Sequence, residues 1–389
     1  MKVRIKDIAE VINGSTPSTQ NPEYYDGDII WITPKDLSDQ NSKYIYSGER
    51  SITQAGYNSC STKMIPENNI LMSSRAPIGL LAINKVECCT NQGFKSLIVD
   101  KTKCNVEYLY YYLKYHIKEI ESLGSGTTFK EVSKDSMEKY EIVLPSIKVQ
   151  ETISNVLSLL DNKIINNNKI NDELESMAKT LYNYWFLQFE FPNENGKPYK
   201  SSGGKMVWNE ELKREIPEGW EVKNAYEIAD IKTGKEDANH ATKNGKYPFF
   251  TCANDVLRCD DYKFDGNVIL IAGNGDFNVK HYNGKFNAYQ RTYVITPHND
   301  KYVGVFHLSC KQTVEKFIKG SNGSIVKFIT LRDIQNIKIL DCKNDKLLEP
   351  FNVFLEKIDL LKKENQELSS LRDFLLPLLM NGQVKFKDK

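Results

Sequence analysis

An internal repeat constrains the fold of this chain of 389 residues more than any other feature of its sequence. Ile8–Gly14 aligns with Ile228–Gly234 at an offset of 220 residues. Further matches follow in the same order in both halves: Gly126 aligns with Gly323 at an offset of 197, and later Lys163 aligns with Lys357 at an offset of 194. We therefore expect two similar structural units in tandem.

Each unit has the pattern of a mixed α/β domain. Short apolar runs bounded by Gly, Pro, Asn and Ser predict strands at Ile29–Ile32, Ile70–Met72, Ser96–Val99, Val268–Ile271 and Tyr293–Ile295. A helix is expected over Glu107–Ser122 in the first unit and over Val303–Lys319 in the second.

A long helix follows each globular unit, the first from about Ile147 to Phe186, because apolar residues recur at alternating steps of four and three. The predicted coiled-coil seam comprises Ile153, Leu157, Leu160, Ile164, Asn171, Leu174, Leu181, Phe354, Ile358, Leu361, Asn365, Leu368 and Leu375. Asn171 and Asn365 occupy equivalent positions, and a buried Asn in a seam can fix its register. The alternative is that both Asn residues lie on a solvated edge.

These patterns predict a mixed α/β (α+β) fold with two similar globular domains, joined by two long coiled-coil helices in a pseudo-twofold internal repeat. The expected boundaries are 1–145 for the first domain, 146–190 for its helix, 191–215 for a polar connector, 216–345 for the second domain and 346–389 for the second helix and tail.

Charge and cysteine content limit the class of protein. The net charge is only +1, from 52 basic and 51 acidic residues, which argues mildly against a dedicated DNA binder but allows a segregated basic face. The eight cysteines form no C-x-x-C pair, so we expect reduced thiols and neither a disulfide nor a zinc framework. The chain lacks an apolar run of about 20 residues and a secretory signal, so a cytoplasmic location without a membrane span is expected.

Motifs that would indicate catalysis are incomplete. Asn21–Tyr24 resembles the Asn/Asp-Pro-Pro-Tyr loop of adenine methyltransferases, but its third position is Glu. Gly273–Gly275 begins like G-x-G-x-x-G, yet the sixth position is Asn278, and no G-x-x-x-x-G-K-[ST] sequence occurs. Glu221–Lys223 could end a nuclease motif, but no suitable Asp accompanies it. We therefore expect neither a catalytic site nor a metal site in this chain.

Polar, Gly-bearing loops recur at equivalent places in both halves. Such loops offer backbone amides to phosphates, while Arg can recognise guanine and Asn or Gln can recognise adenine. For any single loop, an ordinary turn is the alternative. The candidate DNA-binding residues in these loops are Ser73, Ser74, Arg75, Asn91, Gln92, Ser125, Thr127, Lys130, Asn274, Asp276, Gln290, Arg291, Asn322 and Lys327. Lys130 and Lys327 are the candidates for phosphate contacts, and two solvated lysines are the alternative.

Several stretches of the chain resemble the specificity subunits of type I DNA restriction-modification systems. Leu144–Ile164 is similar to the family's entry into its first conserved helix, and Leu181–Phe189 followed by Ile216–Val222 is similar to its passage into the second half. Leu375–Val384 resembles its C-terminal ending. The second domain departs from the first around Gly273–Asn278, where an Arg-Ala-Pro-Ile-Gly stretch like that of the first domain is replaced.

The resemblance implies a non-catalytic subunit whose two target-recognition domains each recognise one half of a bipartite, asymmetric double-stranded DNA sequence. It further implies that the two helices pack antiparallel as a spacer and dock two modification (methyltransferase) subunits, which carry S-adenosylmethionine and methylate adenine. Restriction subunits, which hydrolyse ATP, can join in addition. No cofactor is expected in this chain itself. Two other hypotheses remain open: a coiled-coil scaffold without sequence-specific DNA binding, and an enzyme with an unrecognised site.

Overall fold

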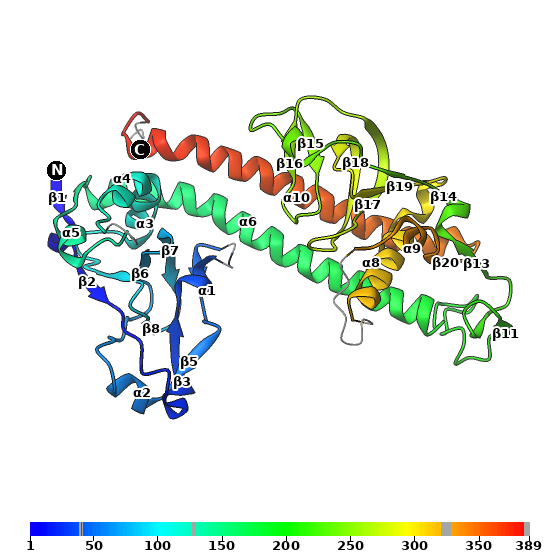
Figure 1. Ribbon diagram of the computed structural model, residues 1–389, viewed down its shortest axis with the longest axis horizontal. Helices are drawn as coiled ribbons and strands as arrows, with labels where there is room; N and C mark the ends of the chain where they lie inside the picture. Colours follow the sequence, from blue (N-terminus) through cyan, green and yellow to red (C-terminus); the bar gives the residue numbers. More distant parts are fainter. Residues whose placement is uncertain (39, 41, 127–129, 320–327, 385–389) are drawn as a thin grey trace. The chain divides into compact units, whose positions relative to one another are not determined.

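The computed structural model describes the chain except residues 39, 41, 127–129, 320–327 and 385–389. It consists of two compact units. Unit 1 comprises Met1–Asn166 and Asn365–Lys389, and unit 2 comprises Asn167–Glu364. Each unit therefore combines one globular domain with about half of each long helix (Figure 1).

The first domain is built on a five-stranded sheet of order β2-β9-β6-β7-β4, a three-stranded sheet of order β5-β3-β8 and the pair β1-β10. Its strands are β1 (Lys2–Arg4), β2 (Ala9–Asn13), β3 (Tyr25–Ile32), β4 (Tyr44–Ile45), β5 (Arg50–Ile52), β6 (Ile70–Ser74), β7 (Ile78–Asn84), β8 (Cys89–Thr90), β9 (Lys95–Val99) and β10 (Glu141–Val143). Its helices are α1 (Pro34–Ser38), α2 (Gln54–Asn58), α3 (Val106–Tyr115), α4 (Ile117–Ser122) and α5 (Lys134–Lys139). The predicted strands around Ile29, Ile70 and Ser96 are confirmed.

The helix predicted over Glu107–Ser122 is interrupted at His116, so that prediction was wrong about continuity. The backbone of His116, with φ −93° and ψ 19°, lies outside the α-helical region. Its ring stacks on Tyr112 at 4.3 Å between centroids, and its Nδ1 lies 2.9 Å from Glu119 Oε1. These contacts accompany the change of direction between α3 and α4.

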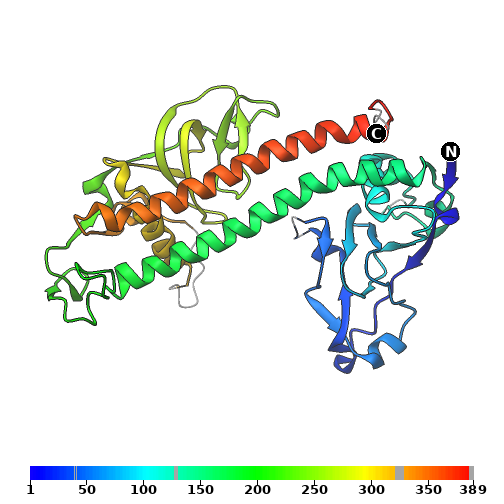
Figure 2. The same cartoon turned by 180° about the vertical axis from the view of Figure 1, so that it is seen from behind.

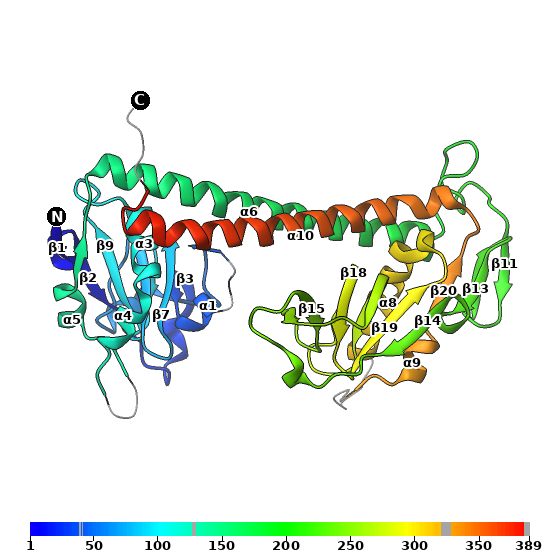
Figure 3. The same ribbon diagram turned by 90° about the horizontal axis from the view of Figure 1, so that it is seen from above.

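The second domain is built on a six-stranded sheet of order β14-β19-β17-β18-β15-β16, with the pairs β13-β20 and β11-β12 beside it. Its strands are β11 (Met206–Asn209), β12 (Arg214–Pro217), β13 (Glu221–Asn224), β14 (Ala229–Thr233), β15 (Tyr247–Phe250), β16 (Leu257–Cys259), β17 (Phe264–Ala272), β18 (Val279–Ala288), β19 (Thr292–Pro297) and β20 (Lys338–Asp341). Helices α7 (Ala225–Ile228), α8 (Val303–Lys319) and α9 (Leu331–Gln335) complete it, and α8 packs against β17 and β18 (Figure 3).

The two domains repeat the same connections, as the sequence repeat predicted. The antiparallel pairs β2-β9, β6-β7 and β1-β10 of the first domain correspond to β14-β19, β17-β18 and β13-β20 of the second. The helix predicted over Val303–Lys319 has those bounds in the structure.

The long helices are α6 (Ile147–Tyr182) and α10 (Asp345–Met380), each of 36 residues. In unit 1 the beginning of α6 packs against the end of α10, because Ile153 and Leu157 share a core with Leu376 and Leu379. In unit 2 the end of α6 packs against the beginning of α10, because Tyr182 shares a core with Phe351. The two helices are therefore antiparallel in both units (Figure 2).

The segment predicted as a polar connector carries more structure than its composition indicates. A π-helical turn, Asn183–Leu187, follows α6, and β11 pairs with β12 as a hairpin. Phe186, Phe189 and Phe191 surround Trp220, with ring centroids 5.2, 5.7 and 4.9 Å away. This aromatic core fixes the passage from α6 to the second domain.

Candidate DNA interface

Loops from separate parts of the sequence meet at one edge of the first domain. Ser15 N donates to Thr90 O at 3.0 Å, Ser74 N donates to Gly93 O at 2.7 Å, and Val132 N donates to Ser74 O at 3.0 Å. These bonds join Gly14–Ser18, Ser73–Gly79, Asn91–Phe94 and the segment from Lys130 to Val132. We call this group of loops the first loop surface.

Two of these bonds recur in the second domain, where Gly273 N donates to Arg291 O at 2.9 Å and Ile329 N donates to Gly273 O at 2.8 Å. Its first loop is held by a different bond, from Gly234 N to Thr292 O at 2.9 Å. Ile329 is the counterpart of Val132 in the repeat. Gly234–Asp237, Gly273–Asp276 and Tyr289–Arg291, joined by these bonds, form the second loop surface.

Gly14 and Gly234 allow the first loop of each surface to approach its neighbour. A Cβ atom added at Gly14 would lie 1.9 Å from the carbonyl oxygen of Asn91, and one added at Gly234 would lie 2.2 Å from that of Tyr289. Any other residue would force the loops apart. The repeated glycine in the sequence therefore has a packing reason that is the same in both domains.

An ion-pair cluster holds the middle of the first loop surface. Glu131 Oε1 lies 2.8 Å from the buried Lys95 Nζ, and Glu131 Oε2 lies 3.7 Å from a guanidinium nitrogen of Arg75. Partial burial acts to raise the pKa of Glu131, but the hydrogen bond and charge of Lys95, the charge of Arg75 and the hydrogen bond from Ser74 together outweigh it, and the pKa is lowered. Glu131 is thus a carboxylate that orients Arg75, whose side chain stays half-exposed.

Ser73 and Ser74, predicted as DNA contacts, are fully buried. Ser73 Oγ donates to Pro77 O at 2.7 Å and accepts from Leu80 N at 2.8 Å, which closes the turn between β6 and β7. Ser74 Oγ lies 3.4 Å from both Lys95 Nζ and Glu131 Oε1. Because their hydroxyls are used internally and shielded, these two residues support the loop and do not reach DNA in this conformation.

The other candidates of the first loop surface differ in exposure. Gln92, Ser125 and Lys130 are exposed, and Gln92 accepts a hydrogen bond from Thr16. Asn91 is half-buried, and its Oδ1 accepts from Gly93 N at 2.9 Å, which leaves its Nδ2 for another partner. Thr127 lies outside the described residues.

In the second loop surface, Asp276, Gln290 and Arg291 are exposed, and Asn274 is half-buried. Asp276 Oδ2 accepts from Asn254 N at 2.9 Å, and Gln290 Nε2 donates to Asp237 Oδ1 at 2.9 Å. Asn322 and Lys327 lie outside the described residues.

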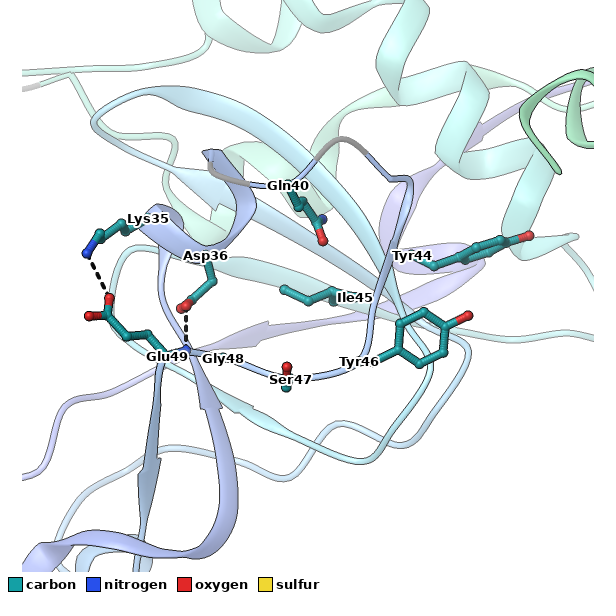
Figure 4. A pocket seen from close by; sticks show the side chains of 9 residues that line it. All are labelled: Lys35, Asp36, Gln40, Tyr44, Ile45, Tyr46, Ser47, Gly48 and Glu49. Carbon is teal, nitrogen blue, oxygen red and sulfur yellow. Dashed lines mark hydrogen bonds and ion pairs between the residues drawn. The ribbon is translucent and has the colours of Figure 1, made fainter. Parts of the chain in front are cut away.

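A pocket of about 570 Å³ opens beside α1 in the first domain, and sequence analysis did not point to it (Figure 4). Lys35 Nζ pairs with Glu49 Oε2 at 2.8 Å across it, and Asp36 Oδ1 accepts from Glu49 N at 2.7 Å. None of the candidate DNA-binding residues lines it. Its only sequence signal is a pair of tyrosines, Tyr44 and Tyr46, of which Tyr46 is exposed.

The structure places every predicted seam residue in a buried or half-buried position. Those buried are Ile153, Leu157, Asn171 and Ile358, and those half-buried are Leu160, Ile164, Leu174, Leu181, Phe354, Leu361, Asn365, Leu368 and Leu375. Asn171 is only 6% exposed, which does not fit the solvated-edge alternative. Within unit 2, the neighbouring Asn167 donates from Nδ2 to Glu364 Oε2 at 2.6 Å.

Buried polar networks fasten each domain to the helices. In unit 1, Lys43 Nζ contacts Glu107 Oε2 at 2.5 Å and Ser158 Oγ of α6 at 2.9 Å, while Asp161 pairs with Arg372 of α10 at 2.8 Å.

In unit 2, different residues make the equivalent attachment. Lys311 of α8 pairs with Glu175 of α6 at 3.0 Å, and His281 of β18 pairs with Asp359 of α10. These contacts connect the second domain to both long helices, whereas the contacts of unit 1 connect the first domain to α6 and α6 to α10.

Comparison with known proteins identifies the family. The family model of the type I restriction modification DNA specificity domain matches residues 1–176 and 217–370. The MjaIX specificity subunit of Methanocaldococcus jannaschii is 34% identical, over 99% of this chain and 93% of that relative. The EcoDI specificity subunit of Escherichia coli is 35% identical over 43% of this chain and 39% of its own length.

A solved structure agrees on the fold. The crystal structure of the S subunit of a type I restriction-modification system from M. genitalium has a TM-score of 0.58 at 20% identity and covers 100% of this chain and 96% of its own. Within the described ranges, no helix has the length and apolar character needed to span a membrane. The chain belongs to the DNA specificity subunits of type I restriction-modification systems, which select the DNA target and are themselves non-catalytic.

Proposed function

We propose that this subunit recognises a bipartite, asymmetric DNA sequence, with one half bound by the first loop surface and the other half by the second. The observation that carries the proposal is that similar loop frameworks, which share two of their backbone hydrogen bonds, present different side chains in the two domains. Arg75 and Asn91 of the first surface correspond to Asn274 and Tyr289 of the second. Because the two loop surfaces have similar frameworks but different side chains, they favour two different half-sites.

The near-neutral charge fits a division of labour between subunits. Phosphate contacts supply most of the salt-dependent affinity of DNA-binding proteins. With a net charge of +1, this chain would contribute base recognition and few phosphate contacts, and its partners would contribute the remainder. Type I specificity subunits assemble with methyltransferase and restriction subunits and bind DNA.

We further propose two modification subunits per chain, one for each unit, acting in the cytoplasm. They would bring S-adenosylmethionine, and restriction subunits would bring ATP hydrolysis. Exposed apolar side chains along the helices support a protein partner there, because such residues mark interaction surfaces when they gather on one element. They include Leu159 and Met177 on α6 and Leu360 and Phe374 on α10.

The test is a comparison of N6-methyladenine across the genome in strains with and without the gene. We expect one split motif, with two short halves around a fixed gap, to lose its methylation when the gene is deleted. An unchanged pattern in a strain that expresses the protein would contradict the proposal and favour a coiled-coil scaffold.

Single substitutions then assign the halves. Arg75→Ala should relax specificity at a position of one half only, and Arg291→Ala at a position of the other, each by about 1–3 kcal/mol of discrimination. Lys200→Ala, an exposed change in the connector, is the matched control and should leave both halves unchanged. Relaxation of the same half by both Arg substitutions would contradict the assignment of one domain to each half.

A further inference from the structure

A group of metal-ligand side chains lies at the edge of the second domain's sheet. A ring nitrogen of His240, the Sγ of Cys259 and a carboxylate oxygen of Asp261 all lie within 4.8 Å of one another. His240 ends the 3-10 turn Ala238–His240, Cys259 ends β16, and Asp261 follows two residues later. The 18 residues between His240 and Cys259 match no common zinc spacing, which explains why sequence analysis predicted no zinc site here.

The surroundings orient these side chains as the outer shell of a metal site does. His240 Nε2 lies 2.7 Å from Asp261 Oδ1, whereas its other nitrogen, Nδ1, lies 3.4 Å from Glu236 Oε2. Histidines that bind metals usually direct the second ring nitrogen to a carboxylate or carbonyl. Glu236 is itself held by Lys263, and Asn287 Nδ2 donates to Asp261 Oδ1 at 3.3 Å.

A simple ion pair between His240 and Asp261 does not account for the third member of the group. Cys259 is 0% exposed, and its Sγ lies 3.1 Å from the backbone oxygen of Asp261, so the thiol is on the same side as the carboxylate. One nitrogen, one sulfur and one oxygen ligand suit Zn²⁺, whereas Mg²⁺ and Ca²⁺ prefer oxygen alone.

We propose that His240, Cys259 and Asp261 bind one Zn²⁺ ion through the imidazole, the thiolate and one carboxylate oxygen, with water as the fourth ligand. The thiol proton of Cys259 is released to solvent on binding. The ion fastens the loop between β14 and β15 to β16, at the edge of the sheet. Asp237, in that loop, accepts the hydrogen bond from Gln290, so the ion also stabilises part of the second loop surface.

The test uses the full-length chain after removal of metal with a chelator. Titration with Zn²⁺ against a chromophoric competitor should give one equivalent per chain, and Co²⁺ should give a tetrahedral spectrum with a thiolate-to-cobalt band. Cys259→Ser should abolish that band. Cys60→Ser, which changes a half-buried cysteine outside the group, is the matched control and should retain it.

Two milder variants keep the test decisive if Cys259→Ser fails to fold. His240→Gln and Asp261→Asn alter half-buried and exposed positions, and each should weaken Zn²⁺ binding at least 10-fold with an unchanged circular dichroism spectrum. Glu236→Gln, which changes a positioning residue, should weaken binding about 10–100-fold. Unchanged affinity in both ligand variants, or a cobalt band that survives Cys259→Ser, would overturn the proposal. These metal measurements do not depend on the proposed role in DNA recognition, so either proposal can fail alone.

Discussion

Lys130 illustrates how a residue of the first loop surface can contribute to DNA binding without recognising a base. It is exposed and precedes Glu131, whose carboxylate is already committed to Lys95 and Arg75. An exposed ammonium on a flexible stem is suited to phosphate, because phosphate contacts require charge and not a fixed geometry.

Lys130→Ala should therefore weaken DNA binding to a similar extent for all sequences. The slope of log K against log salt concentration should fall in magnitude by about 0.9, the value for one phosphate contact. Fluorescence anisotropy of the assembled complex over a series of salt concentrations measures this slope. A change confined to one target sequence would instead indicate base recognition by Lys130.

At the residue scale, only part of the candidate DNA interface could be predicted from the sequence. The loops were predictable because the repeat aligns glycines such as Gly14 and Gly234, and the structure brings these loops together. The burial of Ser73 and Ser74 could not be predicted, because the pattern Ser-Ser-Arg does not show which side chains a turn directs inward. The group at His240 was hidden for a related reason: the fold of the loop between β14 and β15 brings His240 to Cys259 and Asp261, and no sequence spacing indicates that fold.

At the scale of elements, buried polar pairs determine how each domain attaches to the helices. Asp161 of α6 pairs with Arg372 of α10 and accepts a hydrogen bond from Tyr111 of α3. A charge left without its partner in such a place costs far more than the intact pair contributes.

Asp161→Ala should destabilise unit 1 by about 1.5–3 kcal/mol, the range for a lost hydrogen bond to a charged group, because Tyr111 and Arg372 both lose the Asp161 carboxylate and Arg372 keeps only that of Asp373. Asp135→Ala, which removes a surface pair with Lys139, is the matched control and should cost only a small fraction of this. Urea unfolding followed by circular dichroism measures both. Equal losses in the two variants would show that the Asp161 pair is not energetically special.

Helix α8 carries a pH-dependent contribution to stability. Burial, reinforced by the nearby charges of Lys311, His281 and Lys362, lowers the pKa of His307 well below 6.5. The unfolded chain takes up a proton near pH 6.5 while the folded chain does not, so stability is full above that pH and is lost below it.

We expect His307→Gln to reduce the pH dependence of stability below pH 6.5 by about 1.4 kcal/mol per pH unit, the effect of one proton. The exposed His298→Gln is the control and should leave the slope unchanged. Denaturant titrations at several pH values between about 5 and 7 provide the comparison. The same slope in wild type and His307→Gln would mean that His307 is protonated in the folded state.

At the scale of the whole molecule, the repeat and the heptads were sufficient to predict two mixed α/β domains and two long helices, and the family resemblance added that the helices are antiparallel. The aromatic core at Phe186, Phe189, Phe191 and Trp220 was not predictable, because its members come from three different predicted segments, the end of the first helix, the connector and the second domain. The Gly, Pro and Asn content of the connector predicts its polar surface but not the burial of an aromatic ring within it.

Helix length should determine the unrecognised gap between half-sites. Insertion of four residues into both helices, next to Asn166 and next to Glu364, adds about 6 Å, and four residues slightly exceed one turn, so the helix faces are nearly preserved. The methylated motif should keep both halves and gain about two base pairs in its gap. An altered half-site with an unchanged gap would contradict this role of the helices.

The separate cores of the two units have a consequence for how the protein can change over generations. The first domain shares its core with the ends of the helices that lie in unit 1, and the second domain has cores of its own. Mutation or recombination can therefore replace one loop surface while the other half of the protein still folds. A lineage could acquire a new specificity one half at a time, and each intermediate would be a folded protein on which selection can act.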